Sequence, residues 1–231
     1  MGITIHFETE FRGSKKELIN RLNEISDFAR ILGFQESGPI YQMDYASDYN
    51  TPDKYTPMTK NPNGESVIDE SYRWAKIQSV PLCSVMYVDR SAPLTIQNRQ
   101  IEALKKHKAE LHKKNGFVLS LWYGKGCEST NLCFIRTGKG RVWKGHSFTK
   151  TQYASEFVKA HVAVCTLLKA VEKMGLVKEV SDEGEYYETE DITKLTDNSE
   201  ANLQMIASMV DLLKEQFGSE VKVSGQGNGA K

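Results

Sequence analysis

Apolar and polar residues alternate at the start of the chain and then change to a helical spacing. Residues 3–7 alternate with a period of two, which predicts a strand with one buried face. Ser14 and Glu17 form a capping box, and Gly33 is a typical residue to end a helix. Between them, apolar residues recur every three or four positions: Leu18, Ile19, Leu22, Ile25, Phe28, Ala29 and Leu32.

The second half of the chain predicts short strands followed by helices. Glycines separate runs of β-forming residues at 117–123, 131–136, 141–143 and 147–150. A helix is predicted over 156–174 with Ser155 as its N-cap, then a strand over 176–180 and an extended segment over 185–188. A last helix is predicted over about 200–217, with these residues facing inward: Leu203, Ile206, Met209, Val210, Leu212, Leu213 and Phe217.

The middle of the chain has weaker patterns. Tyr41, Met43 and Tyr45 predict a short strand, residues 48–65 a long surface loop, and residues 67–90 further strands. A basic helix with a thin apolar stripe is predicted over 97–114, ending at Asn115-Gly116. Six basic residues against Glu102 and Glu110 give this segment a net charge of +4.

Strands and helices mix without regular alternation, which favours an α+β fold. We expect a largely antiparallel mixed sheet with three to four helices packed on it. Residues 1–223 are expected to form a single domain with a surface loop at about 46–66, and the glycine-rich residues 224–231 a disordered tail.

Composition narrows the function classes. Lys and Arg number 30 and Asp and Glu number 30, so the net charge is zero, which disfavours a dedicated nucleic-acid-binding protein. No apolar run approaches the roughly 18–20 residues of a membrane span, and no signal peptide is visible. The four cysteines show no CxxC or zinc-finger spacing, so we expect reduced thiols and a cytoplasmic location: Cys83, Cys127, Cys133 and Cys165. Cys165 lies in an apolar helical pattern and is expected to be buried.

Three segments carry a resemblance. These are residues 148–153 (Phe-Thr-Lys-Thr-Gln-Tyr), the helix that holds His161, and residues 181–189 with their Asp-Glu-Gly-x-Tyr-x-Glu-Thr turn. Together with the opening strand Gly2–Phe7, they resemble a group of uncharacterised bacterial proteins. The match is good over about residues 117–217 and implies a shared fold, but the group has no established activity.

His161 is the main candidate for chemistry. It falls on an apolar stripe of its predicted helix and therefore should point inward. One interpretation is a neutral core histidine bonded to a carboxylate or carbonyl. The other is a metal ligand or general base beside nearby acids, because one histidine with several carboxylates suits a divalent metal. Those acids are Asp182, Glu183, Glu185 and Glu188, with His161, Asp182 and Glu188 as the expected metal ligands.

Lys150, Thr151 and Gln152 precede the N-terminus of the 156–174 helix, where unpaired amides and Lys150 could hold an anion. If the strands before and after this helix run parallel, their carboxyl ends and the helix N-terminus share one edge of the sheet. Residues 150–152, His161, Asp182 and Glu183 would then converge.

Two function classes stay open at this point. The first, slightly favoured, is a ligand- or protein-binding module, with a protein partner or self-association. Its support is the separation of charge: residues 179–200 hold nine acids against Lys194, a net charge of −8, opposite in sign to the basic helix. The second is a metal-assisted hydrolase that uses His161, the carboxylates of 182–188 and Lys150 as an anion clamp. The cofactor is unknown, with a divalent metal as the candidate.

Overall fold

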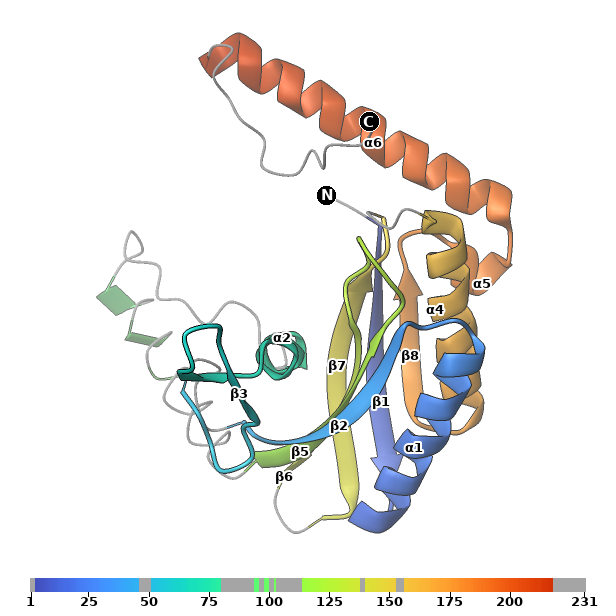
Figure 1. Cartoon of the computed structure of the whole chain (residues 1–231). Coiled ribbons are helices and arrows are strands. Elements are labelled where there is room, and N and C mark those ends of the chain that lie inside the picture. Colours follow the sequence, from blue (N-terminus) through green and yellow to red (C-terminus); the bar gives the residue numbers. More distant parts are fainter. Residues whose placement is uncertain are drawn as a thin grey trace.

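Six strands form one sheet, which is the frame for every other element (Figure 1). The computed structural model describes residues 3–45, 51–79, 94–95, 98–99, 102, 114–137, 140–152 and 156–217. The strands are β1 (Thr4–Arg12), β2 (Glu36–Asp44), β5 (Lys114–Trp122), β6 (Thr130–Thr137), β7 (Val142–Lys150) and β8 (Val177–Asp182). Their order is β2-β5-β6-β7-β1-β8, and each neighbouring pair is antiparallel. The predicted α+β class with a largely antiparallel sheet is confirmed.

Helices cover both faces of this sheet. The helices α1 (Lys15–Ile31) and α4 (Phe157–Lys173) lie on one face, and α2 (Glu70–Ser79) lies on the other (Figure 1). The short α5 (Tyr186–Thr189) follows β8, and the long α6 (Ile192–Phe217) extends beyond the sheet. A separate two-stranded sheet pairs β3 (Met58–Lys60) with β4 (Ser66–Ile68).

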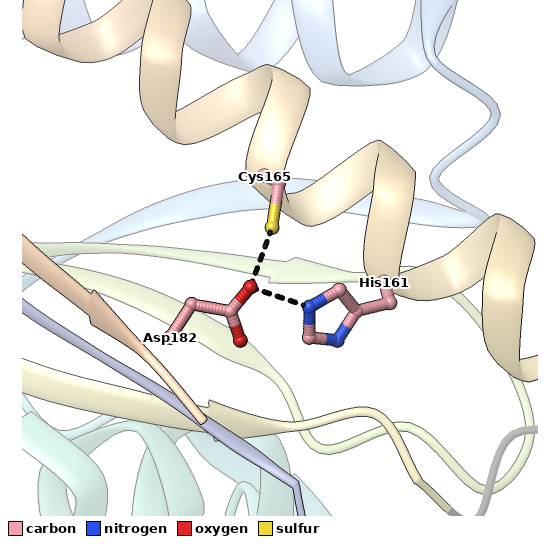
Figure 2. Close-up of side chains that lie close together, drawn as sticks. All are labelled: His161, Cys165 and Asp182. Atoms are coloured by element: carbon pink, nitrogen blue, oxygen red, sulfur yellow. Dashed lines mark hydrogen bonds and ion pairs between the residues drawn. The ribbon is translucent and has the colours of Figure 1, made fainter. Parts of the chain in front are cut away.

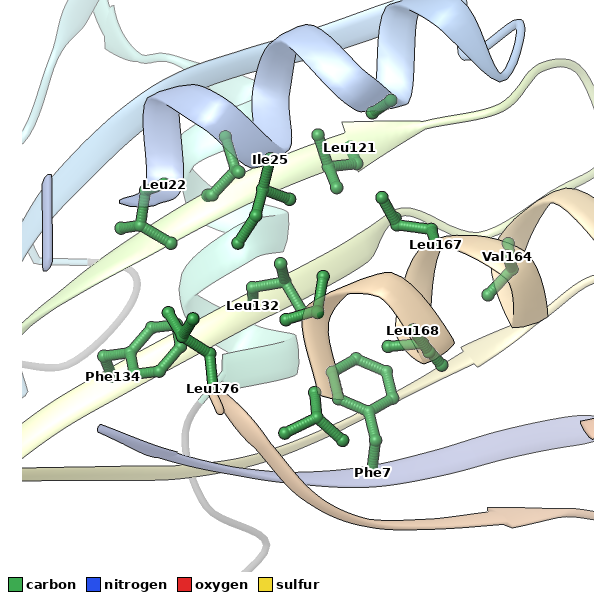
Figure 3. Close-up of a cluster of buried hydrophobic side chains, with 14 of the residues drawn as sticks. Phe7, Leu22, Ile25, Leu121, Leu132, Phe134, Val164, Leu167, Leu168 and Leu176 are labelled. Atoms are coloured by element: carbon green, nitrogen blue, oxygen red, sulfur yellow. The ribbon is translucent and has the colours of Figure 1, made fainter. Parts of the chain in front are cut away.

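The main core fills the space between the sheet and the helices α1 and α4 (Figure 3). The predicted capping box starts α1, because the Ser14 side chain accepts from the Glu17 amide and the Glu17 side chain accepts from the Ser14 amide. The buried side chains of this core include Phe7, Leu22, Ile25, Leu121, Leu132, Phe134, Val164, Leu167, Leu168 and Leu176.

The opposite face of the sheet carries a smaller core beneath α2, and here the prediction of strands over 67–90 was wrong for residues 70–79. Val67 and Ile68 do lie in a strand, but residues 70–79 form a helix. Asp69 starts that helix because its Oδ1 accepts hydrogen bonds from the backbone amides of Ser71 (2.9 Å) and Tyr72 (3.2 Å). Residues 80–90 lie outside the described residues, as do residues 97, 100–101 and 103–113 of the predicted basic helix.

Two glycines led to wrong predictions of the strand boundaries in the second half of the chain. Residues 141–143 and 147–150 were predicted as two strands, but β7 is continuous through Gly145. A Cβ on Gly145 would lie 2.1 Å from the Cys133 carbonyl oxygen, so this glycine permits close contact with β6 rather than a turn. Gly116 acts in the same way inside β5, since its Cβ would lie 2.6 Å from the Phe134 oxygen. Asn115 and Gly116 therefore belong to a strand and do not end a helix.

Two further corrections concern the end of the chain. Residues 185–188 are not extended, because the side chain of Asp182 accepts from the amides of Gly184 and Tyr187 and folds the chain into α5. The last helix starts at Ile192, not at about residue 200, and Leu203 and Leu212 are exposed rather than inward.

The predicted surface loop at about 46–66 is only partly a loop. Residues 46–50 lie outside the described residues, whereas 58–60 and 66–68 form the β3–β4 sheet. Asp53 contributes a buried side chain. The predicted tail at 224–231 and the predicted N-cap Ser155 also fall outside the described residues.

Candidate functional site

The topology brings one end of β7, β8 and α4 together. Both β7 and β8 pair antiparallel with β1, which lies between them, so β7 and β8 run in the same direction. The helix α4 connects them and returns along the sheet. The carboxyl ends of both strands and the first turns of α4 therefore meet at one edge of the sheet. This is the crossover with parallel strands on which the predicted site depended.

His161 is the centre of a buried hydrogen-bond network at this edge (Figure 2). Its Nε2 lies 2.9 Å from Oδ2 of Asp182, and its Nδ1 lies 2.8 Å from Oγ1 of Thr151. The side chains of His161 and Asp182 are both 0% exposed, and Thr151 is also fully buried. A ring proton on Nε2 is donated to the carboxylate, and the threonine hydroxyl then donates to Nδ1, which satisfies all three groups.

The carboxylate of Asp182 accepts hydrogen bonds from several sides. The Gly184 amide donates to Oδ1 at 2.8 Å, and the Tyr187 amide donates to Oδ2 at 3.0 Å. Burial alone raises the pKa of this carboxyl, but the bonds from His161 and the two amides outweigh burial and lower the pKa below its ordinary value. The aspartate is therefore held in its ionised form inside the protein.

Cys165 completes the cluster from the next turn of α4. Its Sγ lies 3.7 Å from Oδ2 of Asp182, on the same side as His161 (Figure 2). Burial, together with the negative charge of Asp182, strongly raises the pKa of this thiol. Cys165 is thus a protonated, unreactive thiol in the cluster as it stands.

Aromatic rings and one glycine enclose the cluster. The Phe157 ring centroid lies 5.7 Å from that of His161, and the Tyr186 centroid lies 6.4 Å from it. A Cβ on Gly184 would lie 3.0 Å from Nε2 of His161 and 2.7 Å from Leu195, so only glycine allows this close approach. Tyr186 also lines a surface groove with Phe28, Thr166, Lys169, Ala170, Lys173 and Glu190.

The structure brings together only part of the predicted site. Thr151, His161 and Asp182 are in contact, whereas Lys150 and Gln152 take other roles. The Lys150 carbonyl accepts from the Glu128 amide, and Oε1 of Gln152 accepts from the Ile3 amide.

The acids after Asp182 also lie away from His161. Oε2 of Glu183 accepts from the Thr4 amide, and Glu185 pairs with Lys194 at 3.7 Å. Glu188 is exposed on α5 and makes no hydrogen bond or ion pair in the described part of the chain. Cys165, not Glu188, is the third residue with a possible ligand atom beside His161 and Asp182. The spacing of His161 and Cys165, four residues apart on a helix, was a usable signal in the sequence.

A second buried polar cluster was missed entirely. Nζ of Lys76 lies 3.1 Å from Oδ2 of Asp53, with side-chain exposures of 1% and 4%. The Tyr72 hydroxyl lies 3.2 Å from both carboxylate oxygens, and Thr56 donates to Oδ1 at 2.9 Å. Burial raises the pKa of Asp53, but bonds from the Tyr55 amide, Lys76 and Thr56 outweigh it and lower the pKa to about 2. No sequence signal marked this cluster, because Asp53 lies in an irregular polar segment.

Comparisons with protein-family models, with curated proteins and with solved structures give no match. Among the residues that the structure describes, no helix has the length and apolarity to cross a bilayer.

Proposed function

We propose that this chain is a protein-binding module that assembles through α6, with a second copy of the chain as the partner. The observation that carries the proposal is the exposure of Leu203 (53%), Met205 (45%) and Leu212 (59%) on this helix. Large apolar side chains that gather on one element mark an interaction surface more often than scattered ones do.

The helix α6 is anchored at one end and presented at the other. Near its start, Leu195 is fully buried and Ser199 is 9% exposed. Beyond these residues the helix extends away from the sheet (Figure 1). At 1.5 Å per residue, the segment from residue 200 to residue 217 is about 27 Å long, enough for several turns of contact.

The shape of this surface favours a helix as the occupant. The exposed apolar residues follow a helix rather than line a cavity, and helices bind one another by packing side-chain ridges into grooves. A second copy supplies such a helix without any other protein. Met205 and Leu212 are seven residues apart and lie on the same side of the helix, whereas Leu203 lies on the opposite side. An antiparallel two-fold pair sets the Met205–Leu212 side of one copy against the same side of the other.

Charge supports self-association as well. Residues 179–200 carry a net charge of −8 and residues 97–114 one of +4, in a chain whose net charge is zero. Separated charges of opposite sign on one chain favour its association with another copy, and such attraction weakens with salt.

The binding module is preferred over the hydrolase because the cluster around His161 does not reach the surface. Thr151, His161 and Cys165 are fully buried, and they line neither the groove at Tyr186 nor the one formed by Met58, Val67, Ile68 and Arg73 with their neighbours. A hydrolase needs its reacting groups within hydrogen-bond distance of a substrate.

Sedimentation equilibrium of the full chain tests the proposal. We expect a dimer that becomes a monomer when Leu203→Gln, Met205→Gln and Leu212→Gln are combined, since glutamine keeps helix propensity. The matched control is Ile31→Gln, which changes an apolar residue 80% exposed on α1 and should leave the dimer intact. A wild-type chain that stays monomeric up to its solubility limit, or a triple variant that stays dimeric, contradicts the proposal.

A further inference from the structure

The buried cluster around His161 combines three ligand types that zinc accepts. A histidine nitrogen, a cysteine sulfur and an aspartate oxygen all lie within 4.8 Å of one another, and all three residues are buried. Nitrogen, thiolate and carboxylate ligands together are typical of Zn²⁺ and not of Mg²⁺ or Ca²⁺. We propose that His161, Cys165 and Asp182 bind one Zn²⁺ ion. This inference does not depend on the proposed role of α6.

The distances between the ligand atoms fit a tetrahedral ion. Bonds of about 2.0 Å to nitrogen or oxygen and about 2.3 Å to sulfur place the nitrogen about 3.3 Å, and the sulfur about 3.5 Å, from the oxygen. In the structure, Nε2 of His161 lies 2.9 Å and Sγ of Cys165 lies 3.7 Å from Oδ2 of Asp182. These two pairs need shifts of less than half an ångström, while the third pair, the His161 nitrogen and the Cys165 sulfur, lies within 4.8 Å and must close to about 3.5 Å.

Neighbouring groups already orient two of the ligands. Metal-binding histidines nearly always donate their other ring N–H to an acceptor, and Oγ1 of Thr151 lies 2.8 Å from Nδ1 of His161. The Gly184 amide holds Oδ1 of Asp182, and the Tyr187 amide holds Oδ2, which also faces the other two ligand atoms. Oriented ligands of this kind lower the entropic cost of assembling a metal site.

Zinc binding at this cluster moves protons as well as the ion. The ring proton of His161 shifts to Nδ1, where it is donated to Thr151, and Nε2 becomes the ligand. Cys165 loses its proton to solvent and binds as a thiolate. The two negative charges of Cys165 and Asp182 then balance the two positive charges of the ion, so the buried site is neutral.

The site connects two elements and keeps one coordination position. His161 and Cys165 lie on α4, and Asp182 ends β8, so the ion fixes the helix to the edge of the sheet. Three protein ligands leave the fourth tetrahedral position to water. Tyr186 is half-buried, and its ring lies between that of His161 and a surface groove that it lines.

Cobalt substitution tests this site with a direct signature. The purified full chain is freed of metal with a chelator and titrated with Co²⁺, which gives a near-ultraviolet absorption band only when a thiolate binds it. Zn²⁺ is then titrated against the bound Co²⁺. We expect one ion per chain, a Co²⁺–thiolate band, and a rise in melting temperature with Zn²⁺ because the ion binds the folded state.

Variants assign the site to its residues. Cys165→Ala should abolish the band, and His161→Gln should weaken Zn²⁺ binding at least tenfold. Cys133→Ala and Cys127→Ala, at two other buried cysteines, should leave both unchanged. Thr151→Val should weaken Zn²⁺ binding about tenfold by removing the acceptor of the ring proton.

Several outcomes of these experiments would contradict the proposed zinc site. No thiolate band on the wild-type chain does so, as does a band that persists in Cys165→Ala or disappears in Cys133→Ala or Cys127→Ala. If Cys165→Ala does not fold, Thr151→Val decides: a tenfold weaker affinity supports the site, and an unchanged affinity contradicts it.

Discussion

Two ionised aspartates are buried on opposite faces of the same sheet, and the protein handles them differently. On the α4 face, Asp182 accepts from a histidine, and on the α2 face, Asp53 accepts from a lysine. In both, backbone amides within five residues also donate to the carboxylate, and the main partner comes from a helix. Hydrogen bonds from nearby backbone amides thus lower the free-energy cost of burying each carboxylate. The residue that the helix contributes then determines the chemistry of the cluster.

The helix residue that bonds to each aspartate also gives the two clusters different affinities for a cation. The ammonium of Lys76 already neutralises Asp53 and repels any cation, so that cluster is suited to holding α2 on the sheet. His161 can present a lone pair, and Cys165 can supply a thiolate beside it. Only the α4 cluster therefore has the donors of a metal site.

The largest effect is expected from Asp182→Ala. This change leaves Nε2 of His161 and the amides of Gly184 and Tyr187 without their acceptor. Groups buried without partners are costly, and we expect a loss of about 4 kcal/mol in the free energy of unfolding. Urea unfolding measures it, with Asp197→Ala on the exposed side of α6 as the control, where a change below about 0.5 kcal/mol is expected. An effect as small as that of the control would mean that the cluster contributes little to stability.

Lys76→Met should cost about 3 kcal/mol, because it leaves the charge of Asp53 buried without its ammonium partner. The Thr56 and Tyr72 hydroxyls and the Tyr55 amide still donate to the carboxylate, so the loss is smaller than at Asp182. The double variant Asp53→Asn with Lys76→Met should be more stable than Lys76→Met alone, since it buries no unpaired charge. Equal stability of the single and double variants would show that the ion pair is not the reason for the loss.

Acid should weaken the Asp53 cluster within a definite pH range. The pKa of Asp53 is lowered to about 2, below its ordinary value of 3.8. A lowered folded-state pKa gives stability that is complete above the ordinary pKa and is lost as pH falls through the folded one. We expect Asp53 to account for a loss of about 2 kcal/mol between pH of about 4 and about 2.

The difference between wild type and Asp53→Asn isolates this contribution, because Asp182, whose pKa is also lowered, responds in the same direction in both chains. Urea unfolding across the pH range measures both chains. Identical pH dependence in the two would contradict the assignment.

The sequence predicted the α4 cluster better than the α2 cluster, for a physical reason. His161 interrupts an apolar stripe at helical spacing, so its burial could be inferred and a polar partner had to exist. A parallel arrangement of the strands before and after that helix, which the sequence left open, would bring Asp182 and Glu183 close to it, and Asp182 proved to be the partner. Lys76 and Asp53 lie among other polar residues, where burial depends on tertiary packing that no local pattern records.

The strand and helix errors have a similar origin. Gly145 and Gly116 were interpreted as breaks, but each is a contact point between strands whose partner is remote in sequence. The apolar pattern of α6 correctly predicted a helix, although Leu203 and Leu212 do not face the core. Periodicity predicts that an apolar face exists and does not say what covers it.

The smallest effect is expected from Thr151→Val, which keeps the shape of the side chain and removes one hydroxyl. In metal-free protein, Nδ1 of His161 then loses its only hydrogen-bond partner in the described part of the chain, at a cost of about 1 kcal/mol. Thr166→Val on α4, the helix that carries His161, is the control, because the Thr166 hydroxyl donates to the Val162 carbonyl one turn earlier and to no other group in the described residues, so its loss should be nearly neutral. Urea unfolding of both variants without metal measures the difference. If Thr151→Val is as neutral as its control, the threonine does not hold the ring, and His161 depends on Asp182 alone.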